Sequence, residues 1–305
     1  MSYSCPKDTQ PPERETASSR SRRPCPFLGA FLSLCWIAAL HPMLGETAAA
    51  QGICDRTPQV RDKILYQIRQ APGTSGSGPG CADVTTDQLA ILKSLGVIDA
   101  NLTTLQEHDF RGLTSLKQLH LGNNALTTLP EGIFQGLSKL EWLDLPRNSL
   151  TTLPEGVFQA LSTLDTLDLS DNSLTTLPNG LFSDLNSLKW LSFARNSLTE
   201  LPDGFSNGLN SLEILWLIRN SLDKLPPAVF DGLTSIEGLF LSRNALSELP
   251  EALLRGLDTL ESLSLYDNRL RTLPPGIFSG LDSLAWLSLH SNFLQELPNG
   301  IFDNV

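Results

Sequence analysis

The chain has 305 residues and a formal net charge of −11, from 33 acidic and 22 basic side chains. This acidic balance favours solubility and argues against nonspecific binding to nucleic acid or to an anionic membrane surface. Beyond residue 50 the histidines are His108, His120 and His290, and no motif places them beside a nucleophile or in a metal-ligand set. We therefore expect neither an enzyme nor a cofactor.

The amino terminus is typical of a secretory signal peptide. Residues 27–40 form an apolar run that follows Arg20, Arg22 and Arg23 and precedes the small residues 47–50. A basic flank, a short apolar core and small residues at the cleavage site are the features of such a leader. The run is shorter than the roughly 20 residues that span a bilayer. We expect residues 1–50 to be removed, which predicts a secreted or cell-surface protein with no membrane span; the long basic segment leaves the true start codon open.

The next segment, residues 51–91, is predicted to be a small helical cap. It contains Cys54 and Cys81, the only cysteines beyond residue 50, and two cysteines in an exported chain predict one disulfide. Between them, apolar residues recur at helical spacing behind Thr57 and Pro58, a pair that favours a helix start. The cap is expected to cover the first of the repeated units that begin near residue 92.

A period of 24 residues runs through residues 92–305 and gives nine units of the form LxxLxLxxNxLxxLPxGxFxGLxx. The leucines of the LxL segment alternate at period two, so we expect them to point inward from a short strand. Stacking the units then pairs these strands into one parallel sheet. The asparagine is expected to satisfy loop backbone groups. It recurs at Asn124, Asn148, Asn172, Asn196, Asn220, Asn244, Asn268 and Asn292.

Three places depart from this regularity. In the first unit Ala100 stands where the asparagine belongs, as expected of a terminal repeat that meets a cap. In another, Phe205 and Ser206 replace the usual Ile-Phe pair, which predicts a local kink or a looser back wall. The ninth unit closes at Val305 without a cap sequence, so we expect a fragment of a longer protein. The alternative is that this uncapped end docks, for example in a homo-oligomer.

The strand positions between the inward leucines form columns of outward side chains on the concave face. All four tryptophans beyond residue 50 fall in these columns, where solubility alone would favour polar residues. Exposed apolar patches with a charged rim mark binding surfaces, and Trp, Tyr and Arg dominate interface energetics. The predicted ligand-binding set is Trp142, Trp190, Arg195, Ile214, Trp216, Ile218, Arg219, Phe240, Arg243, Tyr266 and Trp286. A missing segment or a second copy covering these aromatics is the alternative.

The position between the two inward residues of each strand segment forms a middle outward column. This column contains His120, Asp144, Asp168 and Ser192 on successive strands. Carboxylates suit a divalent cation, so His120, Asp144 and Asp168 are weak metal candidates, although a solvated acidic patch is the favoured interpretation. Ser192 lies three strands from His120, about 14 Å at the usual strand spacing, which excludes a Ser/His/Asp triad. Asn101 begins an N-glycosylation acceptor pattern that matters only in a eukaryotic host.

The repeat resembles the typical 24-residue leucine-rich repeat of Toll-like receptor ectodomains, variable lymphocyte receptors and secreted bacterial surface proteins; the single cysteine pair is closer to the bacterial caps. The resemblance covers residues 92–305. It implies an α/β solenoid, a horseshoe with a parallel sheet on the concave face and irregular or 3-10 segments on the convex side. It also implies a non-enzymatic module whose concave face binds a protein, or alternatively a glycan. A self-associating structural or matrix protein, or the ligand-binding fragment of a longer receptor or adhesin, remains an alternative.

Overall fold

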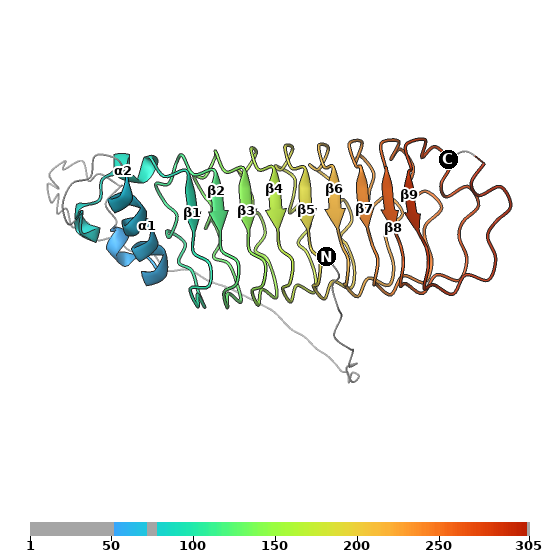
Figure 1. Cartoon of the computed structure of the whole chain (residues 1–305), viewed down its shortest axis with the longest axis horizontal. Coiled ribbons are helices and arrows are strands. Elements are labelled where there is room, and N and C mark those ends of the chain that lie inside the picture. Colours follow the sequence, from blue (N-terminus) through green and yellow to red (C-terminus); the bar gives the residue numbers. More distant parts are fainter. Residues whose placement is uncertain (1–51, 72–77, 304–305) are drawn as a thin grey trace, which may run out of the picture. The chain divides into compact units, whose positions relative to one another are not determined.

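The computed structural model describes residues 52–71 and 78–303. The predicted leader and the uncapped end at Val305 lie outside these ranges. The described residues form a solenoid in which nine three-residue strands lie side by side in chain order, as one parallel sheet (Figure 1). The strands are β1 (Ser94–Gly96), β2 (Gln118–His120), β3 (Trp142–Asp144), β4 (Thr166–Asp168), β5 (Trp190–Ser192), β6 (Ile214–Trp216), β7 (Gly238–Phe240), β8 (Ser262–Ser264) and β9 (Trp286–Ser288).

Neighbouring strands pair in strict 24-residue register. Leu119 of β2 is opposite Leu143 of β3, and Leu191 of β5 is opposite Leu215 of β6. The central leucines of β1 to β8 are fully buried, and they form one continuous core with the leucines of the loops. Burying one leucine stabilises the fold by about 1.5–3 kcal/mol. A single unit cannot bury its leucines without neighbouring units on both sides, so this stabilisation depends on stacking. The predicted solenoid with its parallel sheet is confirmed.

The recurring asparagines connect each repeat to the one before it. Asn148 Nδ2 donates to the carbonyl of Leu121, 3.0 Å away in the preceding repeat, and to Leu145 in its own. Its Oδ1 accepts from the backbone N–H of Leu126 at 3.0 Å. The first repeat has Ala100 at this position and makes no such contact to a preceding repeat, because the segment before it is the cap. Its own loop is supported instead by Asn124, whose Oδ1 accepts from the Ala100 N–H.

Phenylalanines fill the convex half of the core. The rings of Phe110, Phe134 and Phe158 stack in series, with centroids 6.3 and 6.2 Å apart. The displaced Phe205 is buried and meets Phe182 edge to face at 5.4 Å, and Phe193, which replaces an inward leucine, makes a second edge contact to Phe182. The predicted loosening of the back wall is therefore wrong, because Phe193 adds volume where the aromatic has moved.

The cap is helical, as predicted. It contains the 3-10 segments Ile53–Asp55 and Cys81–Asp83, the helices α1 (Pro58–Gln70) and α2 (Thr86–Ala90), and the Cys54–Cys81 disulfide. Figure 1 shows the helices beside β1. In helix α1 the apolar face from Val60 to Ile68 is buried.

A polar contact that no sequence pattern indicated attaches the cap to the repeats. Both carboxylate oxygens of Asp109 accept hydrogen bonds from Thr57, at 2.7 Å from its backbone N–H and 2.6 Å from its hydroxyl. Arg56 donates to the Asp109 carbonyl at 2.8 Å. Burial lowers the pKa of Arg56 to about 10, partly offset by the charge of Asp109. This contact aligns the cap with the first repeat.

Within residues 52–71 and 78–303, no helix is both long and apolar enough to cross a membrane.

Candidate ligand-binding face

The strand register turns single outward residues into columns that cross the concave face. One column begins the strands and includes Trp142, Thr166, Trp190 and Ile214, each opposite the next. A second column ends the strands and includes Asp168, Ser192, Trp216 and Phe240. Because adjacent strands lie about 4.8 Å apart, neighbouring side chains in a column are within contact distance. The columns that were predicted from the period therefore exist.

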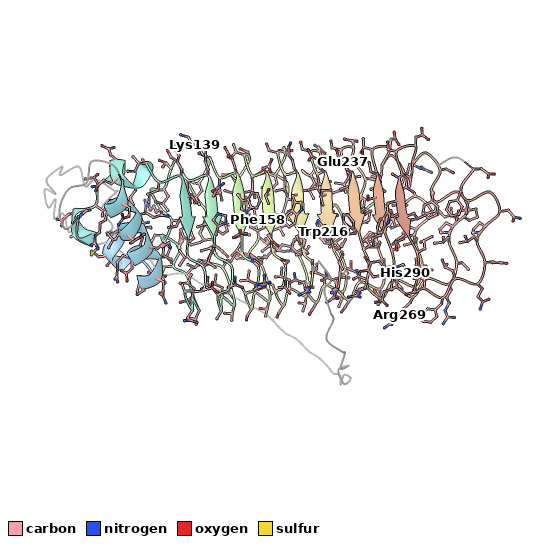
Figure 2. All side chains as sticks on the ribbon, in the orientation of Figure 1. Lys139, Phe158, Trp216, Glu237, Arg269 and His290 are labelled. Atoms are coloured by element: carbon pink, nitrogen blue, oxygen red, sulfur yellow. A yellow bond between two sulfur atoms is a disulfide. The ribbon has the colours of Figure 1, made fainter. Side chains whose placement is uncertain are left out.

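The densest group of outward apolar residues, here called the aromatic patch, lies on β6 and β7 and on the loop residues that follow β6 and β8. Trp216, labelled in Figure 2, stacks on Phe240 with ring centroids 4.2 Å apart and planes at 15°. Gly238, which is opposite Ile214, leaves room for the neighbouring side chains, because a Cβ there would lie 2.8 Å from both Ile214 and Phe240. The members of the aromatic patch are half-buried: Ile214, Trp216, Ile218, Phe240 and Tyr266.

The patch continues toward the carboxyl-terminal repeats through a second stack. Tyr266 packs on His290 with centroids 4.7 Å apart, and the Arg243 guanidinium lies 5.7 Å from the Tyr266 ring. Arg243 also lies 3.5 Å from Asp267. His290, labelled in Figure 2, was not in the predicted set, although it stands one repeat of 24 residues after Tyr266, at the same outward position, which could have indicated it.

Arg195, Arg219 and Arg243 occupy equivalent positions three residues after a strand end, and all have left-handed backbone conformations, with φ between 57° and 59°. Arg195 pairs with Asp171 at 3.0 Å. Arg219 differs from the prediction of an exposed rim. It is only 6% exposed, and its Nη1 and Nη2 atoms are buried with no hydrogen-bond partner. The Trp216 indole nitrogen is likewise a buried donor without an acceptor.

The three remaining predicted tryptophans lie outside the aromatic patch. Trp286 is 48% exposed and stands at β9, separated from Ile214 in its column by Gly238 and Ser262. At the other end, Trp142 is 42% exposed and Trp190 is half-buried. These two rings belong to a separate feature on β3 to β5.

That feature is a cavity of about 300 Å³, here called the tryptophan cavity, lined by Trp142, Asp144, Thr166, Asp168 and Trp190. The Asp144 carboxylate contacts His120 Nδ1 at 2.8 Å and accepts from the Trp142 indole N–H at 3.3 Å. Asp168 accepts from the Ser170 N–H at 2.9 Å. Burial raises the pKa of Asp168, and the charges of Asp144 and Asp171 raise it further against the hydrogen bonds of Ser170.

The register keeps Ser192 three strands from His120, as predicted, so the structure places no triad there. In the described ranges no three His, Cys, Asp or Glu side chains are grouped so that they could hold a metal ion. His120, Asp144 and Asp168 therefore do not form a metal site in this structure. Asn101 is exposed, and its backbone has a left-handed conformation, with φ at 53°.

The sequence matches the leucine rich repeat family model over residues 91–150, 139–198, 188–246 and 235–294, which together span most of the chain. No curated protein sequence matches it.

The solved structures that are similar to the chain include two complexes. One is a complex of TLR13 with ssRNA13, with a TM-score of 0.59 and 27% identity over 73% of this chain. The other is the complex of Toll with Spatzle from Drosophila, with a TM-score of 0.56 and 27% identity over 70% of this chain. This chain spans 39% of the first protein and 31% of the second. The similarity supports a Toll-like receptor type of leucine-rich repeat solenoid.

Proposed function

Because the chain belongs to the leucine-rich repeat family, we propose that it is a secreted or cell-surface recognition module that binds a protein ligand on its concave face. The observation that carries this proposal is the aromatic patch on β6 to β8. Its rings stand at outward strand positions, whereas the inward positions beside them already hold a complete leucine core. Folding alone therefore does not account for them, and large aromatic side chains are the ones that contribute most at interfaces.

The similar structures support the same direction. Toll is seen in complex with Spatzle, so at least one protein that is similar to this chain binds a partner. The TLR13 structure contains ssRNA, which makes nucleic acid a second ligand class to test. We favour protein, because the net charge of −11 opposes a polyanion. The proposal includes a leader in residues 1–50, a cap in residues 51–91 and repeats in residues 92–305.

The test begins with peptides selected on the purified protein from a random displayed library. Their binding is then measured on a variant with Trp216, Phe240 and Tyr266 all replaced by alanine. We expect a loss of binding of more than about tenfold, because interface energy concentrates in such residues. A matched variant with the exposed convex residues Glu131, Glu155 and Glu251 replaced by alanine is expected to bind normally.

Circular dichroism and a melting curve establish that both variants are folded. Peptides that bind the aromatic variant as well as the unmodified protein would refute the proposal. A single-stranded RNA that binds more tightly than any peptide at physiological salt would assign the face to nucleic acid instead. A neutral oligosaccharide array addresses the glycan alternative in the same format.

The second candidate function, a self-associating structural protein, uses the same surface. It is favoured by the half-buried rings of Trp216 and Phe240, which a second copy could cover. Acrylamide quenching of tryptophan fluorescence over a protein concentration series separates the two. Protection that grows with concentration supports self-association, and constant strong quenching supports an open face.

A further inference from the structure

The tryptophan cavity has a shape that the repeat produces directly. Trp142 and Trp190 occupy the same column on β3 and β5, and Thr166 stands between them on β4. Thr166 is 5% exposed and forms the floor. Two strand spacings separate the two tryptophans by about 10 Å, so after one ring thickness the gap holds a single side-chain-sized group. The small residue between two large ones therefore leaves a slot with two indole walls.

One end of this slot is negatively charged. Asp144 and Asp168 are opposite each other on β3 and β4, in the column next to the tryptophans. In the described part of the chain, neither has a lysine or arginine within ion-pair distance, and only Asp144 contacts a histidine, His120. The nearby Arg195 is already paired with Asp171. The cavity thus combines two tryptophan side chains with negative charge that no lysine or arginine of the described residues compensates.

We propose that the tryptophan cavity binds an organic ammonium group, either the side chain of a lysine on a protein partner or a quaternary ammonium ligand. An ammonium ion over the face of tryptophan is attracted by the negative charge of the ring face, and the attraction grows as water is excluded. Asp144 and Asp168 supply the counter-charge. A metal ion fits less well, because the indole walls offer it no ligand atoms.

This inference rests on the proposal that the concave face binds ligands, and it names the chemistry of one subsite. A sugar ring also stacks on tryptophan, and its hydroxyls can donate to the two carboxylates, but it carries no net positive charge for them to attract. The distinction between a cation and a neutral group of the same shape is therefore the decisive measurement.

The experiment uses the full chain and ligand-observed NMR with four probes. Choline represents the quaternary ammonium source and Nα-acetyl-lysine methylamide the lysine source. The uncharged probe 3,3-dimethylbutan-1-ol has the shape of choline, and methyl β-glucoside represents a sugar. We expect at least one cationic probe to bind about tenfold more tightly than either neutral probe. The cation that binds more tightly identifies the source.

Two variants test the location. Asp168→Asn and Trp190→Ala are each expected to weaken the cationic probe about tenfold. Their matched controls, Asp267→Asn and Phe293→Ala, change an exposed carboxylate and an exposed aromatic ring outside the cavity and are expected to leave binding unchanged. Melting curves of all four variants confirm folding, and Asp168→Asn removes charge without removing volume.

Equal binding of choline and its neutral analogue, preference for the glucoside, no binding of either cation, or no effect of Asp168→Asn would each overturn the proposal. The outcome is separable from that of the proposed function. Selected peptides that still need Trp216 and Phe240 while the cations fail to bind would refute only this subsite.

Discussion

Replacing Arg219 by methionine is expected to stabilise the protein, the reverse of most substitutions at buried positions. The side chain is 6% exposed, and both terminal nitrogens are buried with no hydrogen-bond partner. Arg195 and Arg243 occupy the equivalent positions on either side, about 5 Å away along the column, so the nearest charges in this row have the same sign. A buried charge without a partner costs several kcal/mol.

Methionine keeps most of the length of the side chain and removes the charge. Replacing buried ions by apolar residues of similar size has stabilised other proteins by about 1–4 kcal/mol, and we expect a gain in that range. For a domain of this size, each kcal/mol raises the melting temperature by about 2–4 °C. The backbone at position 219 is left-handed, with φ at 59°. Arginine and methionine adopt this conformation at a similar cost, so it does not contribute to the difference in stability between the two proteins.

The assay is urea unfolding monitored by circular dichroism, with the slope compared between variants because repeat arrays can depart from two-state behaviour. Arg195→Met is the matched control. It loses the 3.0 Å contact to Asp171 and is expected to be neutral or slightly destabilised. A loss of more than about 1 kcal/mol in Arg219→Met would refute the reasoning, since it would mean that the guanidinium stabilises the fold. A gain would indicate an arginine kept for binding rather than for folding.

Three further outcomes are expected. Leu215→Ala leaves a cavity in the fully buried column and is expected to lower the free energy of unfolding by about 2–5 kcal/mol, measured in urea. Trp216→Ala, at the neighbouring outward position, should lower it clearly less. Similar losses in the two variants would mean that the inward and outward assignment is wrong. Asn220→Ala removes two hydrogen bonds to the carbonyls of Phe193 and Leu217 and one from the Leu198 N–H. Since each backbone group left without a partner costs about 1–3 kcal/mol, we expect the free energy of unfolding to fall by at least about 3 kcal/mol. A change below about 1 kcal/mol would contradict the structural role of this asparagine. Burial raises the pKa of Asp168 above its ordinary value of 3.8, so ionisation of this carboxyl group destabilises the folded state. Asp168→Asn is therefore expected to raise the free energy of unfolding at neutral pH, and this gain should disappear as the pH falls through the raised pKa toward 3.8. A gain that does not depend on pH would exclude this cause.

Much of the site could be placed from the sequence because the repeat has a fixed register. Once Leu143 and Leu145 are assigned inward, Trp142 and Asp144 must point outward, and each has its counterpart 24 residues along. The register alone places the outward columns correctly and excludes Ser192 as a nucleophile. It does not specify how far a side chain folds back onto its neighbours, which is why the predicted exposure of Arg219 was wrong and the stack of Tyr266 on His290 was missed.

The sequence by itself determined the solenoid, its parallel sheet, the disulfide-stapled cap and the identity of the side chains in each column. These depend on local periodicity, since every unit repeats the same inward leucines and the same asparagine. Only the tertiary structure decided the rest. The contact of Thr57 with Asp109 joins residues 52 positions apart, and the tryptophan cavity needs two side chains held apart by a third on the strand between them. Such features depend on side-chain packing between repeats, which periodicity does not specify.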